Sequence, residues 1–338
     1  MVSISDIHLN NTSLQTPGSG PTVALLGATA GIGLSTLHAI LKNTSTPTVY
    51  IVGRNPSRLR DLISTAQKLN ASATLIPIET GDLTLVKNAE KAAQEIASKA
   101  SRLDLLVMSP GYLSFASAPD FSPEGLDRIT SIRYHARMRF LLTVLPLLRA
   151  APNPRVISIL AGGQEGDLKL EDLAMTQKTT YGPLYAAGAA GAMTTLFLEE
   201  VAKQEGNEKI VFLHIFPGLV ATDLQVRDSG WFYHMLWEWI AKPLFKIFGA
   251  SAEDAGERVL FAGTNGRFRR VQDPESVRGT LVQEGSDGVL GSGVYAVKED
   301  SEVVKEGGNK ELKALKEKGA GRKVWEYTVG EFERIQRL

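Results

Sequence analysis

The sequence contains no cysteine, and this absence excludes several kinds of chemistry at once. Disulfide bonds, thiolate nucleophiles and cysteine–zinc sites all need a cysteine side chain. The five histidines show no metal-ligand spacing such as H-x-x-x-H. We therefore expect no metal centre in this protein.

An excess of charge of either sign is also missing. Lys and Arg together number 37, as do Asp and Glu, so no basic field attracts nucleic acid. Residues 1–21 are polar and lack the basic and apolar regions of a signal peptide. No apolar run is long enough to span a membrane. These absences predict a cytoplasmic protein that binds no nucleic acid.

The chain does contain alternating strand-like and helix-like segments. The apolar strand candidates are residues 23–26, 48–52, 74–77, 103–108, 155–160 and 209–216. This alternation predicts an α/β fold, a Rossmann-type doubly wound parallel sheet with helices on both faces. We expect a flexible arm over residues 1–20, one nucleotide-binding domain over residues 21–272, and a C-terminal extension over residues 273–338 that packs on the same domain.

The most informative stretch is residues 23–33, Val-Ala-Leu-Leu-Gly-Ala-Thr-Ala-Gly-Ile-Gly. Four apolar residues lead into Gly27, Gly31 and Gly33, and a helix-like segment follows directly. Such a turn lets the backbone approach a pyrophosphate, which then faces the free N–H groups at the helix start. The stretch predicts a dinucleotide site; the alternative is a structural turn that binds no nucleotide.

The segment after the second expected strand indicates which dinucleotide binds. NAD sites usually place an acid there to bind the ribose 2′-hydroxyl. Residues 52–58 contain no acid, but they contain Arg54 and Arg58. Guanidinium groups suit the 2′-phosphate of NADP(H). We therefore predict NADP(H) as the cofactor; the alternative is that both arginines are solvated surface residues.

The G-x-x-x-G-x-G spacing and the Pro217-Gly218 turn resemble those of the short-chain dehydrogenase/reductase (SDR) superfamily. The resemblance implies that Asp82 contacts the adenine, that the Val220 backbone meets the nicotinamide amide, and that Thr222 approaches the phosphates. The cofactor site that the resemblance implies consists of Gly27, Thr29, Gly31, Ile32, Gly33, Arg54, Arg58, Asp82, Leu83, Gly111, Pro217, Gly218, Val220 and Thr222.

Other stretches are similar to a fungal subgroup of the same superfamily. They are residues 137–140, 193–196, 212–218 and 291–295, and the similarity covers most of residues 20–338. Members of this subgroup often belong to secondary metabolism and frequently lack the usual catalytic residues.

SDR reductases use an Asn–Ser–Tyr–Lys tetrad, in which tyrosine exchanges a proton with the substrate oxygen and lysine lowers its pKa. Here Arg133 stands at the Asn position, Ala161 stands at the Ser position, and residues 179–202 contain no lysine. The spacing from Ala161 favours Tyr185 as the proton donor, with Tyr181 as the alternative. Arg133 is a candidate replacement cation, or else part of a solvated or interface face.

Three of the four tryptophans lie in residues 231–248, inside the expected substrate lid at about residues 223–250. Such aromatic density favours a large apolar substrate. Docking on a membrane surface, a homodimer contact and an ordinary helix packed on the core would give the same signal.

These features favour an NADP(H)-dependent oxidoreductase, a carbonyl reductase or alcohol dehydrogenase, acting on a bulky apolar small molecule such as a secondary metabolite. The incomplete tetrad keeps two alternatives open. One is a non-redox isomerase, dehydratase or cyclase that retains NADP(H), and the other is a pseudoenzyme that senses the cofactor or binds a partner.

Overall fold

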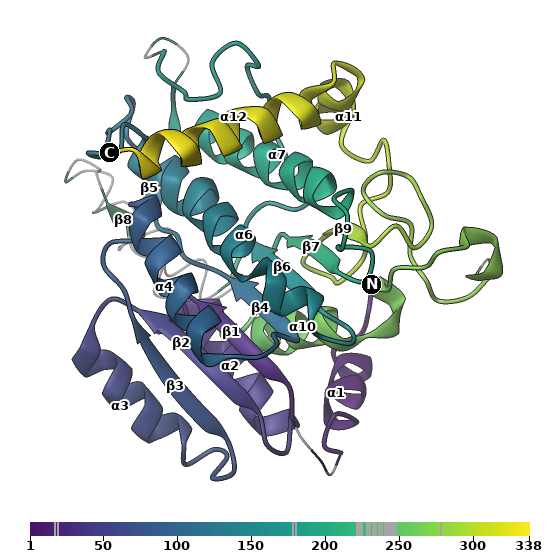
Figure 1. The fold of residues 1–338 in the computed structure, drawn as a ribbon. Coiled ribbons are helices and arrows are strands. Elements are labelled where there is room, and N and C mark those ends of the chain that lie inside the picture. Colours follow the sequence, from purple (N-terminus) through teal and green to yellow (C-terminus); the bar gives the residue numbers. More distant parts are fainter. Residues whose placement is uncertain are drawn as a thin grey trace.

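The computed structural model describes residues 1–338 except 17, 19, 178, 180, 221–225, 228–230, 232–234, 236–238, 240–248 and 278. Its centre is a parallel seven-stranded sheet with the order β3-β2-β1-β4-β6-β7-β9 (Figure 1). The strands are β1 (Thr22–Leu26), β2 (Thr48–Gly53), β3 (Thr74–Glu79), β4 (Leu105–Met108), β6 (Arg155–Ile159), β7 (Val211–Ile215) and β9 (Val294–Val297). The chain reverses its direction across the sheet between β1 and β4, which confirms the predicted doubly wound Rossmann-type fold.

The central strands are buried on both faces because their sequences are apolar at successive positions. In β1, Val23 and Leu25 contribute to one core, whereas Ala24 and Leu26 contribute to the other. Such a strand is covered on both sides by helices and therefore shows no alternation of polar and apolar residues.

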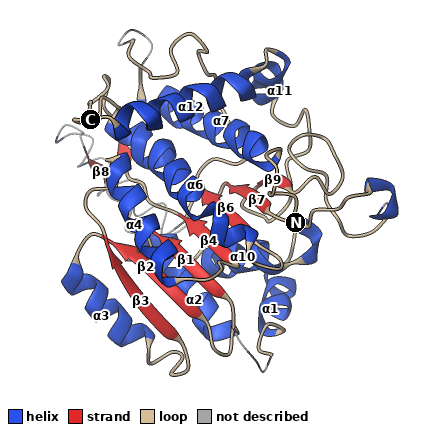
Figure 2. Cartoon of the chain, viewed as in Figure 1, coloured by secondary structure: helices blue, strands red, loops and turns tan. Residues whose placement is uncertain are grey.

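Helices cover both faces of the sheet (Figure 2). The core on one face includes residues of α2 (Gly31–Asn43), α3 (Pro56–Ala66) and α10 (Ala252–Thr264). The core on the other face includes residues of α4 (Val86–Lys99), α6 (Ala136–Arg149) and α7 (Pro183–Ala202). There α12 (Ala320–Gln336) packs on α7 as an additional outer layer.

Shorter elements lie between these helices and strands. Helix α5 (Arg128–Thr130) leads through a π-helical turn (Ser131–His135) directly into α6. Strands β5 (Leu113–Ser114) and β8 (Val226–Arg227) pair with each other in a separate parallel sheet. Two 3₁₀ turns cover Gly266–Phe268 and Pro274–Val277.

The N-terminal segment differs from the flexible arm expected over residues 1–20. Ile4–Thr12 form helix α1, which packs on α10. The reason is that Ile7 and Asn11 are fully buried, and Asn11 Nδ2 donates to the Glu257 backbone oxygen at 2.9 Å. Within α1, Ile7 is the one buried apolar residue, and the side chains of Asn10 and Asn11 bond to residues 257, 264 and 265, so no local pattern identifies this docking from sequence.

The C-terminal residues complete the same sheet and its outer helical layer. Residues 294–297 form edge strand β9, which pairs with β7. Helix α11 (Lys310–Glu317) is separated from α12 by Gly319, whose φ of +69° lies in the left-handed region. The helical C-terminal segment breaks at this glycine because glycine adopts that conformation readily.

Candidate cofactor and active site

The glycine turn lies at the carboxyl end of β1, where the strand order reverses. Gly27 has a φ of +92°, and a Cβ on it would lie 2.8 Å from the Pro110 nitrogen. A Cβ on Gly33 would lie 2.5 Å from the Gly27 oxygen. Ala30, which precedes α2, makes no side-chain capping bond. The turn therefore packs closely and presents a helix N-terminus without a side-chain cap, as a dinucleotide site requires.

The other predicted residues of this turn lie beside it. Gly31 has a φ of +56° and begins α2, and Ile32 follows it, partly exposed. The Thr29 Cγ2 lies 2.8 Å from where a Cβ on Gly53 would stand. The turn is thus packed against the end of β2, where the next predicted residues begin.

Arg54 and Asp82 follow β2 and β3 at neighbouring strand ends. The Arg54 Nη1 lies 3.9 Å from the Asp82 Oδ1, and their side chains are 44% and 45% exposed. Asp82 Oδ1 also accepts from the Thr84 N–H at 3.0 Å, while Leu83 is buried between them. Arg58 lies in the first turn of α3 and is exposed. The structure therefore brings both arginines to the strand end at which a dinucleotide would place its adenosine half.

The ends of β4 and β7 carry the remaining predicted cofactor residues. Gly111 follows β4, and a Cβ on it would lie 3.8 Å from the Arg137 Nη2. After β7, Pro217 precedes Gly218, whose φ is +70°. Val220 is buried and forms a bridge with residue 250. Thr222 lies outside the described residues.

Arg133 and Tyr181 lie together in a buried cluster with residues that the sequence did not single out. The Arg133 Nη2 donates to the Tyr112 backbone oxygen at 3.0 Å. The Tyr181 hydroxyl donates to the Asp127 Oδ2 at 3.1 Å. Burial lowers the pKa of Arg133, and the neighbouring Tyr181, Tyr112 and Asp127 oppose that shift. No spacing rule links residues 112, 127 and 181, so the cluster could not be predicted.

Tyr185 points to a different part of the site. It lies in the first turn of α7, is half-buried, and accepts a hydrogen bond from the Lys169 backbone N–H at 3.3 Å. No described residue accepts the Tyr185 hydroxyl proton. The structure therefore does not bring Tyr185 into the Arg133 cluster, and it leaves Tyr185 with a hydroxyl proton to donate.

Both tyrosine hydroxyls stay protonated at neutral pH. Burial raises the pKa of Tyr181, and the charge of Asp127 raises it further, while Arg133 acts in the opposite direction. Burial likewise raises the pKa of Tyr185, although the bond from Lys169 opposes the shift. Because neither pKa falls, each phenol is a proton donor and a poor base.

Arg137 is fully buried one helical turn after Arg133. Its Nη1 donates to the Ile159 oxygen at 2.8 Å and to the Ser158 Oγ at 3.1 Å. Its Nη2 donates to the Pro110 oxygen at 2.5 Å. Arg137 thus joins the end of β4 to the end of β6. The i,i+4 spacing from Arg133 is visible in the sequence, but it does not reveal these backbone partners.

The aromatic segment is described at three positions only. Trp231, Met235 and Trp239 are 78%, 44% and 79% exposed. Their spacing of four residues would place them on one face of a helix. The other residues of 231–248, and most of the lid expected at about 223–250, lie outside the described part of the chain. No helix among the described residues is long and apolar enough to cross a membrane.

Comparisons with known proteins point to one family. A family model described as short chain dehydrogenase matches residues 21–231. Oxidoreductase AN1596 of Emericella nidulans is 32% identical over 337 residues, which cover 97% of each chain. Short-chain dehydrogenase/reductase SAT2 of Stachybotrys chartarum is 31% identical, with 92% of each chain covered.

Solved structures of low sequence identity share the fold. L-Sorbose reductase from Gluconobacter frateurii, in complex with NADPH and L-sorbose, superposes with a TM-score of 0.54 at 18% identity. The match covers 73% of this chain and 90% of that one. This similarity supports the arrangement of sheet and helices and nothing finer.

Proposed function

Because the chain belongs to the short-chain dehydrogenase family, we propose that it is an NADP(H)-dependent carbonyl reductase or alcohol dehydrogenase. The observation that carries the proposal is the glycine turn between β1 and α2. Its close backbone packing and the helix start without a side-chain cap match the needs of a pyrophosphate. A dinucleotide there would cross the carboxyl ends of β1 and β4.

The preference for NADP(H) rests on Arg54 and Arg58. Both are exposed at the end of β2, where no acid is present to bind a ribose 2′-hydroxyl. Two guanidinium groups favour the 2′-phosphate through charge-assisted hydrogen bonds. Asp82, 3.9 Å from Arg54, would face the adenine and orient the arginine.

The proposed reaction runs in the direction of reduction. When bound, NADPH supplies a hydride to the carbonyl carbon. Tyr185 donates its hydroxyl proton to the carbonyl oxygen and regains a proton from solvent. Its raised pKa keeps that proton in place at neutral pH, whereas alcohol oxidation would need the phenolate as a base. Arg133, with Tyr181 and Asp127, shapes the neighbouring wall of the site.

A bulky apolar substrate is proposed from the exposed aromatic residues after the Pro217-Gly218 turn. Trp231 and Trp239 are each more than three-quarters exposed. Large exposed apolar side chains near a binding cleft favour contact with an apolar ligand. A homodimer contact or a peripheral membrane contact through residues 231–248 is the alternative use of this segment.

The experiment is a turnover assay with NADPH and a panel of bulky aromatic and polycyclic ketones. We expect alcohol to form with one NADPH consumed per product. Absence of any NADPH consumption across the panel, with the cofactor bound, would contradict the redox assignment.

A second function is favoured by one observation: the pKa of both tyrosines is raised, because the charge of Arg133 beside Tyr181 and the Lys169 hydrogen bond to Tyr185 do not outweigh burial. A non-redox isomerase, dehydratase or cyclase would need the cofactor only as part of its pocket. Product formation without net NADPH consumption would identify this function. A stable complex with another protein and no turnover would instead indicate a pseudoenzyme.

A further inference from the structure

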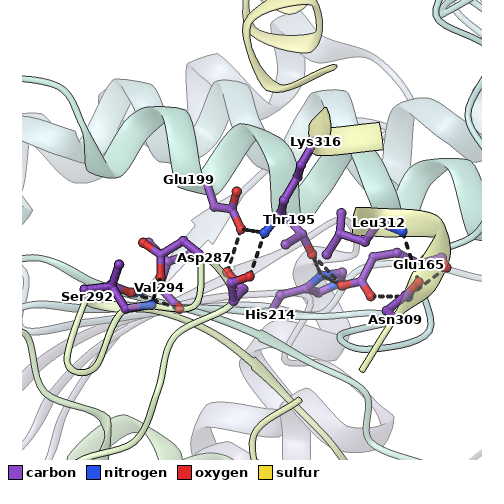
Figure 3. A network of polar contacts seen from close by, with 12 residues as sticks. Glu165, Thr195, Glu199, His214, Asp287, Ser292, Val294, Asn309, Leu312 and Lys316 are labelled. Carbon is purple, nitrogen blue, oxygen red and sulfur yellow. Dashed lines mark hydrogen bonds and ion pairs between the residues drawn. The ribbon is translucent and has the colours of Figure 1, made fainter. Parts of the chain in front are cut away.

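A buried polar network joins β7, α7 and the start of α11 and is not used by the proposed chemistry (Figure 3). His214 of β7 is 1% exposed, and its Nε2 accepts a hydrogen bond from the Ala161 backbone N–H at 3.0 Å. Ala161 lies two residues after the end of β6, at the position where the SDR resemblance implies a serine. The His214 side chain on β7 therefore holds the backbone that follows the neighbouring strand β6.

The contacts fix the tautomer of His214. Because the Ala161 N–H donates to Nε2, that nitrogen carries no proton, and the ring proton resides on Nδ1. Nδ1 lies 2.7 Å from the Thr195 Oγ1 and therefore donates to it. The Thr195 hydroxyl in turn donates to the Glu165 Oε1 at 2.6 Å. The donor and acceptor of each hydrogen bond are therefore fixed: His214 donates to Thr195, and Thr195 donates to Glu165.

Glu165 accepts hydrogen bonds at both of its carboxylate oxygens. Its Oε1 accepts from the Gly163 backbone N–H at 3.1 Å, and its Oε2 accepts from the Asn309 Nδ2 at 2.9 Å. Burial acts to raise the pKa of Glu165, but the contact with His214 and the Thr195 hydrogen bond outweigh it, so that the pKa falls below its ordinary value. The carboxylate is therefore charged at neutral pH and accepts all these bonds.

The network holds the two ends of a short loop, residues 161–165. Ala161 is bound to His214, and Glu165 is bound to Thr195 and Asn309 and, within the loop, to Gly163. Between them, a Cβ on Gly162 would lie 1.9 Å from the His214 backbone oxygen, so the loop lies directly on β7. Residues 161–165 thus have little freedom to move relative to the strand that leads to Pro217.

We propose that His214, Thr195 and Glu165 are positioning residues that fix the loop 161–165 against β7, where it forms the wall of the substrate site in place of the missing serine. This inference rests on the proposed function. The network makes the loop rigid where Ala161 offers no hydroxyl to orient the substrate. Rigidity matters there because a displacement of the loop by about 1 Å can lower the rate about a hundredfold.

The C-terminal extension contributes Asn309 to the same hydrogen-bond network. Asn309 caps α11 through its Oδ1, which accepts from the Leu312 N–H at 3.1 Å, while its Nδ2 binds Glu165. One side chain therefore links the start of α11 to the loop. The extension contributes to the active site in this way, in addition to providing β9.

The test compares His214→Asn with His214→Gln. Both variants replace the ring by a neutral amide, but an asparagine amide reaches the Nδ1 position and a glutamine amide the Nε2 position. His214→Gln should keep an acceptor for the Ala161 N–H, whereas His214→Asn should keep only the Thr195 contact. We expect kcat to fall about tenfold or more in His214→Asn and to change little in His214→Gln. The KM for NADPH should change little in both.

Hydrogen exchange gives a readout that does not depend on turnover. Amides of residues 160–164 should exchange faster in His214→Asn than in His214→Gln. Equal exchange in both variants would overturn the proposal, as would a loosened loop with an unchanged kcat. If the wild-type chain reduced no ketone, the proposed function would fail, yet the exchange comparison would still decide whether His214 holds the loop.

A neighbouring ion pair supplies the matched control. Lys316 Nζ of α11 lies 2.5 Å from the Glu199 Oε1 of α7, and Figure 3 shows this pair beside the network. The pair joins the same two helices without a contact to the loop. The double variant Glu199→Gln/Lys316→Met should lower thermal stability while leaving kcat and the exchange of residues 160–164 unchanged. An Asn309→Ser variant, which keeps the helix cap, should loosen the loop.

Discussion

Arg137 joins the ends of β4 and β6 without an acidic partner among the residues that the structure describes. Burial and the charge of Arg133 lower its pKa to about 9, so the guanidinium remains charged at neutral pH. Its donors go to backbone oxygens of Met108, Pro110 and Ile159 and to the Ser158 hydroxyl. A buried charge of this kind is tolerated because hydrogen bonds replace its solvation.

Replacement of Arg137 should therefore be costly. Arg137→Met leaves several buried oxygens without a donor, and we expect a loss of about 3 kcal/mol or more in the free energy of unfolding. Arg137→Lys keeps the charge but not the forked geometry, so its loss should be smaller. Urea unfolding measures both. A methionine variant as stable as the wild type would contradict this role.

Replacement by phenylalanine should affect turnover at Tyr185 and stability at Tyr181. Tyr185→Phe removes the proposed proton donor, and we expect kcat to fall about a hundredfold or more with little change in cofactor affinity. Tyr181→Phe removes the hydroxyl that donates to Asp127, so it should mainly lower stability. Steady-state kinetics and thermal unfolding of both variants are the measurement. The assignment would be reversed if Tyr181→Phe lost turnover and Tyr185→Phe kept it.

Among the elements, the glycine turn is the one on which the proposed cofactor site depends most. A Cβ at position 33 would lie 2.5 Å from the Gly27 oxygen and 2.6 Å from the Ser109 Oγ. Gly33→Ala should therefore displace the turn and raise the Kd for NADPH at least about tenfold. In Gly330→Ala, where the added methyl meets open space inside α12, the Kd should be unchanged. Unaltered NADPH affinity in Gly33→Ala would rule out the site.

Local patterns predicted the elements well where the signal was contiguous. The apolar runs before residue 27 and around residue 213 became β1 and β7, because buried parallel strands are apolar along their whole length. Helix α1 and the break at Gly319 were not predicted. The docking of α1 depends on Asn11 meeting Glu257, which lies 246 positions away, and no local pattern encodes such a pair.

The same distinction applies to the site. The placement of the glycines and arginines at strand ends could be predicted because they belong to short, contiguous motifs, and their role toward a cofactor stays a prediction. The cluster of Arg133, Tyr181 and Asp127 and the network around His214 join three or more separate segments of the chain. Their members became visible only once the sheet had brought the strand ends together.

At the scale of the whole molecule, a buried histidine should make the fold sensitive to acid. Burial lowers the pKa of His135 from 6.5 to about 3; the Thr130 backbone opposes this shift and the charge of Arg334 adds to it. In the unfolded chain His135 therefore becomes protonated below about pH 6.5, whereas in the folded chain it stays neutral down to about pH 3. Stability is lost as the pH falls through this window, at up to about 1.4 kcal/mol per pH unit.

Urea unfolding of the wild type and of His135→Gln tests this dependence. The wild type should lose about 2 kcal/mol more than the variant between about pH 7 and about pH 5. The comparison isolates His135 from His38, whose pKa burial also lowers. Parallel pH profiles of the two proteins would show that His135 is not the cause.

The most direct test of the central claim is a titration of the purified protein with NADPH and NADH, repeated with Arg54→Ala. Arg60→Ala, an exposed arginine on α3, is the matched control. We expect NADPH to bind more tightly than NADH, and its Kd to rise about tenfold or more in Arg54→Ala and to stay unchanged in Arg60→Ala. Binding of neither nucleotide would contradict the account, and equal binding of both, unaffected by Arg54→Ala, would contradict its assignment of NADP(H).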